Sequence, residues 1–207
     1  MIAIVDYGMG NVRSVERAFK AVGAPATITD DHGLVREAEA LVLPGVGAFG
    51  MAMTRLRASG LDTVLSERVL GDKVPFLGIC LGMQLICTES HEHGHHQGLG
   101  WIDAAVERLD PGTDRLRVPH IGWNDTLPAG ENPLIPEPAI FYFVHSYRVA
   151  ASNEATAATC AYGEPFAAAL ARDNIWATQF HPEKSQDAGL AILRRFSALT
   201  PSLVGSA

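Results

Sequence analysis

Residues 75–84 read PFLGICLGMQ, an apolar run that ends in Gly-Ile-Cys-Leu-Gly and continues with helical periodicity. This pattern predicts a buried strand, a sharp turn at Cys80 and a helix over residues 81–88. It is the sequence form of a nucleophile elbow, in which Gly78 and Gly82 leave room for a strained turn. Cys80 would stand at the helix N-terminus, where unpaired N–H groups and the helix dipole favour the thiolate.

A buried cysteine is often an inert packing residue, so a catalytic interpretation of Cys80 requires a base. The segment QFHPEKS at residues 179–185 contains His181, and Glu183 follows two residues later, where it could orient the imidazole. Groups of this kind meet in space and not in sequence, so their separation along the chain is no objection. We therefore predict a catalytic triad of Cys80, His181 and Glu183.

The first ninety residues alternate short apolar runs with helical patterns. Such alternation predicts parallel strands joined by right-handed crossovers. The expected strands are 2–5, 41–43 and 74–79, and the expected helices are 12–22, 49–58 and 61–70.

After Trp101 the pattern changes to short strands with turn-rich links, several of which we expect to be antiparallel. The Pro-rich stretch 128–138 is predicted to be a surface loop. Together the elements predict one α/β domain over residues 1–207, with three layers and a mixed, mostly parallel central sheet flanked by helices. The expected later strands are 104–109, 116–119, 140–144, 156–162, 166–171 and 175–180, followed by a helix at 187–199.

Composition narrows the classes of function. A formal net charge of −7 argues against a surface that binds nucleic acid. No apolar stretch reaches membrane-spanning length and the N-terminus has no signal pattern, so we expect a cytoplasmic protein with no membrane association. Three cysteines form an odd, sparse set that fits a reducing compartment, and Cys87 and Cys160 are predicted to be packing residues.

The segment PGVGAFG at residues 44–50 places Gly45 and Gly47 on either side of Val46, which gives one peptide unit freedom to turn over. An oxyanion hole needs at least two N–H donors. We expect the N–H of Leu81, directly after the nucleophile, to be one donor and that of Gly47 to be the other. The alternative is a simple glycine-rich loop.

Two further patterns are weaker than they look. DYGMGN at residues 6–11 lacks the third glycine of a dinucleotide fingerprint and has Arg13 in its place, so we interpret it as a tight turn with Asn11 near a helix N-cap.

The loop ESHEHGHHQG at residues 89–98 lacks the spacing of a helical metal site and a complete ligand set, so we expect a solvated loop and no metal. Its histidines are His91, His93, His95 and His96.

GICLGMQ together with QFHPE resembles the class I glutamine amidotransferases, whose triad is Cys, His and Glu. Four more blocks are similar, in the same order, to the glutaminase subunits of imidazole glycerol phosphate synthase, so the resemblance spans nearly the whole chain. These blocks are DYGMGN, PGVGAFG, PHIGWN (119–124) and YFVHSY (142–147).

The resemblance implies hydrolysis of L-glutamine without a metal or organic cofactor. It also implies a heterodimer with a (β/α)₈ barrel cyclase, which uses the ammonia to make imidazole glycerol phosphate and an aminoimidazole carboxamide ribotide in histidine biosynthesis. In that family the strand before the 44–50 loop adopts a nonproductive orientation until the partner is loaded. We therefore expect low activity of the isolated chain.

The resemblance also implies roles for individual residues. Gln84 would hold the α-carboxylate or ammonium end of the substrate and Glu92 its ammonium group, whereas without the family both would be solvent-facing polar side chains. The backbone at His145, Ser146 and Tyr147 would clamp the amino-acid end. The partner interface would contain Asn11, Trp123, Asn124 and Lys184.

Without the family, Trp123 would be a packed aromatic side chain in a turn and Lys184 a solvated charge. Two other functions remain open from the sequence. One is a glutaminase of another synthase, or a cysteine hydrolase such as a γ-glutamyl peptidase. The other is a non-enzymatic interaction module, against which the intact Cys80, His181 and Glu183 argue.

Overall fold

The computed structural model describes residues 1–110, 112, 116–130 and 132–200. The early strands are parallel, as the alternating pattern predicts. β1 (Ile2–Val5), β3 (Ala40–Gly45) and β4 (Phe76–Cys80) are buried along their whole length, which explains their continuous apolar runs. β2 (Ala26–Thr29) pairs in parallel with β1, and β13 (Ile175–Thr178) pairs in parallel with β4.

The later strands extend the same sheet in antiparallel fashion. Its described strands follow the order β2-β1-β3-β4-β13-β12-β11-β8-β9, with four parallel and four antiparallel pairings. The mixed sheet is confirmed, but the parallel part is smaller than expected. The added strands are β12 (Glu164–Arg172), β11 (Thr156–Tyr162), β8 (His120–Pro128) and β9 (Ala139–His145).

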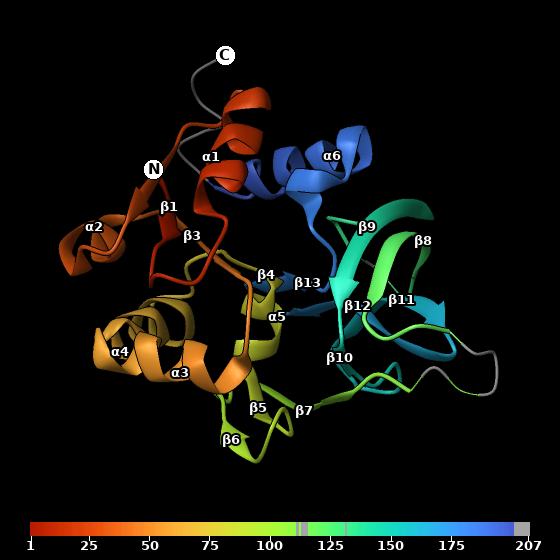
Figure 1. Ribbon diagram of the computed structural model, residues 1–207. Helices are drawn as coiled ribbons and strands as arrows, with labels where there is room; N and C mark the ends of the chain where they lie inside the picture. Colours follow the sequence, from red (N-terminus) through yellow and green to blue (C-terminus); the bar gives the residue numbers. More distant parts are fainter. Residues whose placement is uncertain (111, 113–115, 131, 201–207) are drawn as a thin grey trace.

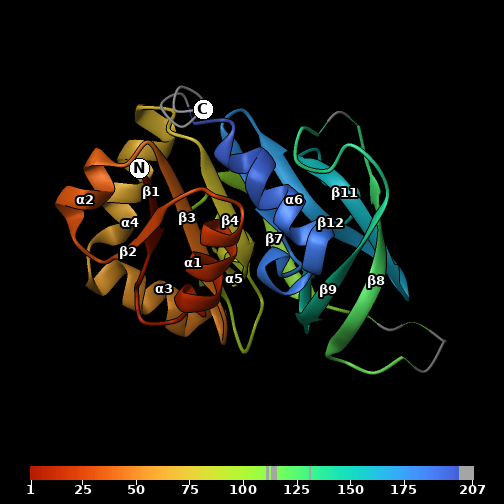
Figure 2. The ribbon, with the colours of Figure 1, turned by 90° about the horizontal axis from the view of Figure 1, so that it is seen from above.

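Helices cover the two faces of this sheet and complete three layers (Figures 1 and 2). α1 (Val12–Ala21) and α6 (Gln186–Ser197) pack on one face, where Phe19 and Phe196 meet edge to face. The other face is covered by α2 (His32–Glu37), α3 (Phe49–Ala58), α4 (Leu61–Ser66) and the π-helical turn η1 (Glu67–Gly71). None of the helices in the described part of the chain is long and apolar enough to cross a bilayer.

A small second sheet lies below the large one in Figure 1. Its strands follow the order β10-β7-β5-β6 and correspond to β10 (Tyr147–Val149), β7 (Ile102–Arg108), β5 (Cys87–Ser90) and β6 (His96–Gln97).

The predicted helix over residues 81–88 is wrong in its second half. α5 (Leu81–Leu85) ends after five residues, and the chain continues as β5, which pairs with β7. A short apolar run has no periodicity that separates helix from strand, so the later pairing decides.

Other expectations also need correction. Residues 116–119 are not a strand but precede β8. The structure also contains two short elements, β2 and α2, that lie outside the expected strands and helices. In the described part of the Pro-rich loop, Leu134 and Ile135 are buried and belong to the core, because the loop packs on α6.

Candidate active site

Three neighbouring strands end at the same edge of the sheet. Gly45 at the end of β3 pairs with Cys80 at the end of β4, and Thr178 at the end of β13 pairs with Ile79. The carboxyl ends of parallel strands are where open α/β sheets bind ligands. The topology therefore brings Cys80 and the segment after Thr178 together.

Cys80 occupies a strained turn between β4 and α5. Its φ is 54° and its ψ is −107°, in a region that non-glycine residues rarely adopt. Gly82 is required there, because a Cβ atom at this position would lie 1.8 Å from the carbonyl oxygen of Leu43. The turn holds the Cys80 side chain in a cavity at the edge of the sheet, 7% exposed.

His181 and Glu183 form a buried pair beside this turn. Nδ1 of His181 donates to Oε1 of Glu183 at 2.7 Å, and the two side chains are only 2% and 1% exposed. His181 directly precedes a 3₁₀ turn, η2 (Pro182–Lys184), which returns Glu183 towards the ring. Among the described residues, Nε2 of His181 has no nitrogen or oxygen partner, and the ring interacts with Cys80.

Burial alone would lower the pKa of His181, but hydrogen bonding to Cys80 and Glu183 and the charges of both raise it from 6.5 to about 9. The imidazole is therefore held protonated at neutral pH beside the sulfur. Such a pair can supply a nucleophile and, from Nε2, a proton for a leaving group.

A cavity of about 420 Å³ opens beside Cys80. It brings together both predicted oxyanion residues, all five predicted substrate-binding residues and Lys184, whereas Asn11, Trp123 and Asn124 do not line it. Its lining consists of Val46, Gly47, Cys80, Leu81, Gln84, Glu92, Pro119, Val144, His145, Ser146, Tyr147, His181 and Lys184.

Gln84 is buried at 6% exposure and not solvent-facing. Its Nε2 donates both to the carbonyl oxygen of Tyr147 at 3.1 Å and to Oε1 of Gln179 at 2.9 Å. A carbonyl oxygen only accepts, so the amide nitrogen must face Tyr147, and both of its hydrogens are used. Oε1 of Gln84 is therefore the atom left free for a ligand, and it can only accept a hydrogen bond, for example from an ammonium group.

Glu92 lies on the loop that follows β5. Its Oε2 accepts a hydrogen bond from the N–H of Phe49 at 2.6 Å, at the start of α3. On the same loop, His95 donates to Glu89 at 2.7 Å, and His91 lies 3.5 Å from Glu89. No group of three or more histidine, cysteine or carboxylate side chains that could hold a metal occurs within the residues described.

The 44–50 loop holds one of its N–H groups away from Cys80. The N–H of Val46 donates to the carbonyl oxygen of Met9 at 3.0 Å, so it is not directed into the cavity. Gly47 has a φ of 101°, a backbone conformation that glycine adopts without strain and that other residues adopt only with strain. Leu81 begins α5, so its N–H has no partner within the helix.

His145 is a second histidine at the cavity, and its hydrogen bonds fix its tautomer. Its Nδ1 donates to the carbonyl oxygen of Tyr147 at 2.9 Å, so its Nε2 accepts from Nδ1 of His120 at 3.0 Å. Burial lowers the pKa of both histidines to about 4. Both rings are therefore neutral at neutral pH, which leaves His181 as the protonated imidazole of the cavity.

The hairpin of β8 and β9 carries an exposed apolar face near the cavity. Trp123 lies on β8 and is 48% exposed, so its interpretation as a packed side chain in a turn is wrong. Nζ of Lys184 lies 5.9 Å from the centroid of the Tyr142 ring, and Trp123 contacts the same ring edge to face. We call this surface the hairpin face; its exposed members are Ile121, Trp123, Leu127 and Ile140.

The remaining predicted interface residues differ in setting. Asn124 is partly buried, and its Nδ2 donates to the carbonyl oxygen of Ala161 at 3.0 Å and lies 3.4 Å from Nε2 of His120. Asn11 is exposed at the N-cap of α1, where its side chain makes no capping hydrogen bond.

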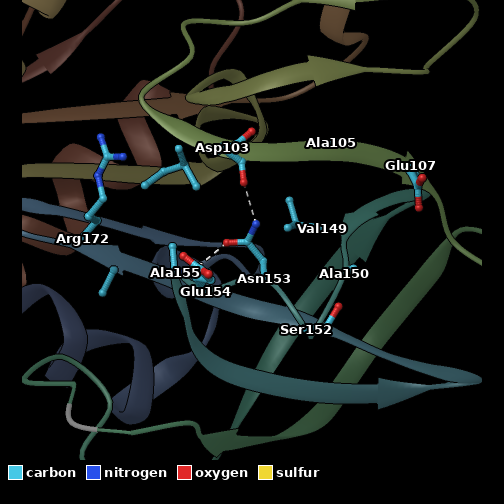
Figure 3. Close-up of a pocket in the computed structure, with 12 residues that line it drawn as sticks. Asp103, Ala105, Glu107, Val149, Ala150, Ser152, Asn153, Glu154, Ala155 and Arg172 are labelled. Carbon is cyan, nitrogen blue, oxygen red and sulfur yellow. Dashed lines mark hydrogen bonds between the residues drawn. The ribbon is translucent and has the colours of Figure 1, made fainter.

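A larger cavity of about 660 Å³ shares no lining residue with the one at Cys80. It lies between β7 and the turn before β11, and Asn153 reaches across it to the carbonyl oxygen of Asp103 at 2.8 Å (Figure 3). Its lining mixes Asp103, Glu107 and Glu154 with Arg172 and small apolar side chains. It contains no cysteine or histidine to pair as nucleophile and base.

Comparisons with known proteins agree with this geometry. A family model described as glutamine amidotransferase class-I matches residues 3–198. The imidazole glycerol phosphate synthase subunit HisH of Syntrophotalea carbinolica is 49% identical over 205 residues, which cover 95% of this chain and 98% of that one. The HisH subunit of Methanothermobacter thermautotrophicus is 48% identical over 198 residues, with coverages of 95% and 97%.

Among solved structures, a crystal structure of a glutamine amidotransferase superposes with a TM-score of 0.75 at 19% identity, covering 96% of this chain and 100% of that one. At this identity the likeness concerns the fold alone. The three-layer arrangement is thus shared with a protein of very different sequence.

Proposed function

The chain belongs to the class I glutamine amidotransferase family, and from this premise we propose that it is the glutaminase subunit of an imidazole glycerol phosphate synthase. The observation that carries the proposal is the buried pair of His181 and Glu183 beside Cys80 at the elbow. We further propose that residues 1–207 act as one glutaminase domain, because β13 joins both halves of the sheet. Three free cysteines fit a cytoplasmic location.

The proposed reaction is acyl transfer from the side-chain amide of L-glutamine to water. The Cys80 thiolate attacks the amide carbon, and the C–N bond breaks as Nε2 of His181 gives its proton to the leaving ammonia. The resulting thioester is attacked by water, whose proton returns to His181, and glutamate leaves. Glu183 holds the ring in the tautomer that keeps Nε2 towards the sulfur.

The substrate would be held by its amino-acid end. Oε1 of Gln84 accepts from the ammonium group, because both N–H groups of Gln84 are already used, and the Glu92 carboxylate supplies the opposite charge. The backbone from His145 to Tyr147 closes the other side of this end. The cavity of about 420 Å³ suits a molecule of this size.

The oxyanion hole would use the N–H of Leu81 and a second donor from the 44–47 segment. With the N–H of Val46 bonded to Met9, the second donor depends on Gly47 or on a rotation of a neighbouring peptide. Loss of one such donor costs about 3–4 kcal/mol of transition-state stabilisation. We therefore propose that the isolated chain turns over glutamine slowly and that the partner corrects this segment.

The proposed partner is a (β/α)₈ barrel cyclase that docks on the hairpin face. Large aromatic side chains surrounded by apolar ones are frequent interface anchors, and Trp123 has this setting. Lys184 connects the hairpin face with the cavity, Asn124 supports the hairpin from behind, and Asn11 would join the rim. In bulk water ammonia is mostly protonated, and the ammonium ion is not a nucleophile. A docked partner would allow ammonia to pass between the two sites without contact with bulk solvent.

Ammonia and glutamate release from L-glutamine tests the proposal. The chain is assayed alone, with a barrel cyclase, and with the cyclase and its phosphoribulosyl substrate. We expect strong stimulation in the last case and its loss in Cys80→Ala, with Cys160→Ala as a matched control at a buried cysteine outside the cavity. Persistent turnover in Cys80→Ala would refute the nucleophile, and hydrolysis of γ-glutamyl peptides without a cyclase would favour a peptidase.

A further inference from the structure

Gln179 is a fully buried polar side chain that lies between the nucleophile and the substrate-binding amide. It follows β13, and its Nε2 lies 3.8 Å from Sγ of Cys80, while its Oε1 accepts from Nε2 of Gln84 at 2.9 Å. We infer that Gln179 is a positioning residue, which fixes the Cys80 sulfur and the Gln84 amide relative to each other. This inference rests on the proposed glutaminase function.

The orientation of the Gln179 amide follows from its neighbours. The Gln84 nitrogen must face the carbonyl oxygen of Tyr147, so it also donates to Gln179. Turning the Gln179 amide over would place two nitrogen donors against each other. Only one orientation satisfies the network, and it directs an N–H of Gln179 at the sulfur.

This arrangement gives the sulfur a hydrogen-bond donor in addition to His181. The thiol of Cys80 otherwise has the carbonyl oxygen of Val144 at 3.9 Å, which accepts only from the protonated form. An amide N–H donates to a thiolate more strongly than to a thiol, because hydrogen bonds to charged groups are the stronger ones. Gln179 therefore favours the reactive form and limits the directions that the sulfur can take.

The backbone of Gln179 is fixed independently of its side chain. Its N–H donates to the carbonyl oxygen of Ala168 at 2.8 Å, and the neighbouring Thr178 hydroxyl donates to the carbonyl oxygen of Phe180 at 3.0 Å. A change of side chain at residue 179 can thus be made while the backbone that leads to His181 remains anchored.

Two substitutions separate the two contacts. Gln179→Glu keeps an acceptor for Gln84 but replaces the amide donor at the sulfur with an acid. Gln179→Met removes both contacts at similar volume. We expect Gln179→Glu to lower kcat about tenfold to a hundredfold with little change in KM, and Gln179→Met to raise KM as well, because Gln84 loses its support.

Alkylation of Cys80 by iodoacetamide, followed by mass spectrometry of its peptide, gives a readout that needs neither glutamine nor partner. The ionisable groups around the sulfur come from several elements and are unchanged in the variants. They are Tyr7 after β1, Glu92 on the loop after β5, His145 on β9, and His181, Glu183 and Lys184 after β13. We expect the pH midpoint of alkylation to rise in both variants relative to the wild type. Burial raises the pKa of Cys87 and of Cys160 to about 12, so these two thiols stay silent.

Gln97→Glu is the matched control, since Gln97 is exposed on β6 and outside the cavity. It should leave the alkylation midpoint, kcat and KM unchanged. An unchanged midpoint in both residue 179 variants, with thermal unfolding as in the wild type, would overturn the inference. Failure of the proposed function is distinguishable, because it appears as absent ammonia release in the wild-type complex, while the alkylation profile still decides the role of Gln179.

Discussion

Replacing Glu183 with Gln tests the pairing on which the proposed chemistry depends. The substitution keeps the size of the side chain but removes the charge that Nδ1 of His181 faces at 2.7 Å. The pair is almost fully buried, so water cannot replace the lost hydrogen bond to the charged carboxylate. A hydrogen bond to a charged group contributes about 1.5–3 kcal/mol of stabilisation. That loss corresponds to a fall of roughly 10- to 100-fold in kcat. KM should hardly change, because Glu183 does not line the cavity.

The pH dependence supplies a second measurement for the same variant. The pKa of His181 is raised from 6.5 to about 9 partly by Glu183, so its removal lowers that pKa. Catalysis needs a protonated His181, and the alkaline limb of the kcat profile should therefore move to lower pH. The same raised pKa means that protonated His181 stabilises the fold fully below pH 6.5 and loses this contribution as pH rises through about 9.

A coupled glutamate assay on the complex across this pH range measures both effects. Glu67→Gln is the matched control, since Glu67 forms a half-exposed pair with Arg36 on the far helices. If Glu183→Gln retained the wild-type rate and alkaline limb, Glu183 would have no part in orienting His181, and the triad would reduce to a pair.

Three further predictions follow from the packing and from buried charge. Gly82→Ala should destabilise the fold by about 1–3 kcal/mol or more in chemical denaturation, because its Cβ would lie 1.8 Å from the Leu43 oxygen, whereas Gly71→Ala meets no atom within 4 Å and should be nearly neutral. Trp123→Ala should weaken binding of the cyclase by about tenfold or more in titration calorimetry without changing thermal unfolding, whereas Leu70→Ala, an exposed apolar residue outside the hairpin face, should not affect binding. The pKa of both His120 and His145 is lowered to about 4, so the contribution of these two neutral rings to the free energy of unfolding should be complete above pH 6.5 and be lost as pH drops towards 4; an equally steep fall in His120→Asn would count against this source.

Much of the parallel half, and the meeting of Cys80 with His181 and Glu183 at one edge of the sheet, could be predicted from the sequence. The strands β1, β3 and β4 are continuous apolar runs in the sequence. The glycines on either side of Cys80 indicate a turn in which a Cβ atom would collide with neighbouring backbone. Cysteine, histidine and glutamate side chains that follow a strand, as at Cys80, His181 and Glu183, indicate possible chemistry by residue type alone. These patterns involve residues that are close together in the sequence, so they can be recognised without a structure.

The features that were missed depend on long-range contacts. Residues 87–90 became a strand because β7 lies beside them, and Trp123 became exposed because β8 turns its odd-numbered residues outwards. Gln179 lay within the QFHPEKS segment, yet its contacts with Cys80 and Gln84 appear only when β13 pairs with β4. The hydrogen bond from the N–H of Val46 to the carbonyl oxygen of Met9 joins two loops, and no sequence pattern indicates that these loops lie close together.

The central position of β13 has a consequence for synthesis on the ribosome. A nascent chain that lacks residues 175–178 leaves both β4 and β12 without their shared neighbour, and unpaired strand edges invite association with other chains. His181 follows β13 directly along the chain. Until residues 175–183 have been synthesised, Cys80 lacks the neighbouring imidazole, so the strand that joins the two halves of the sheet also completes the proposed catalytic group.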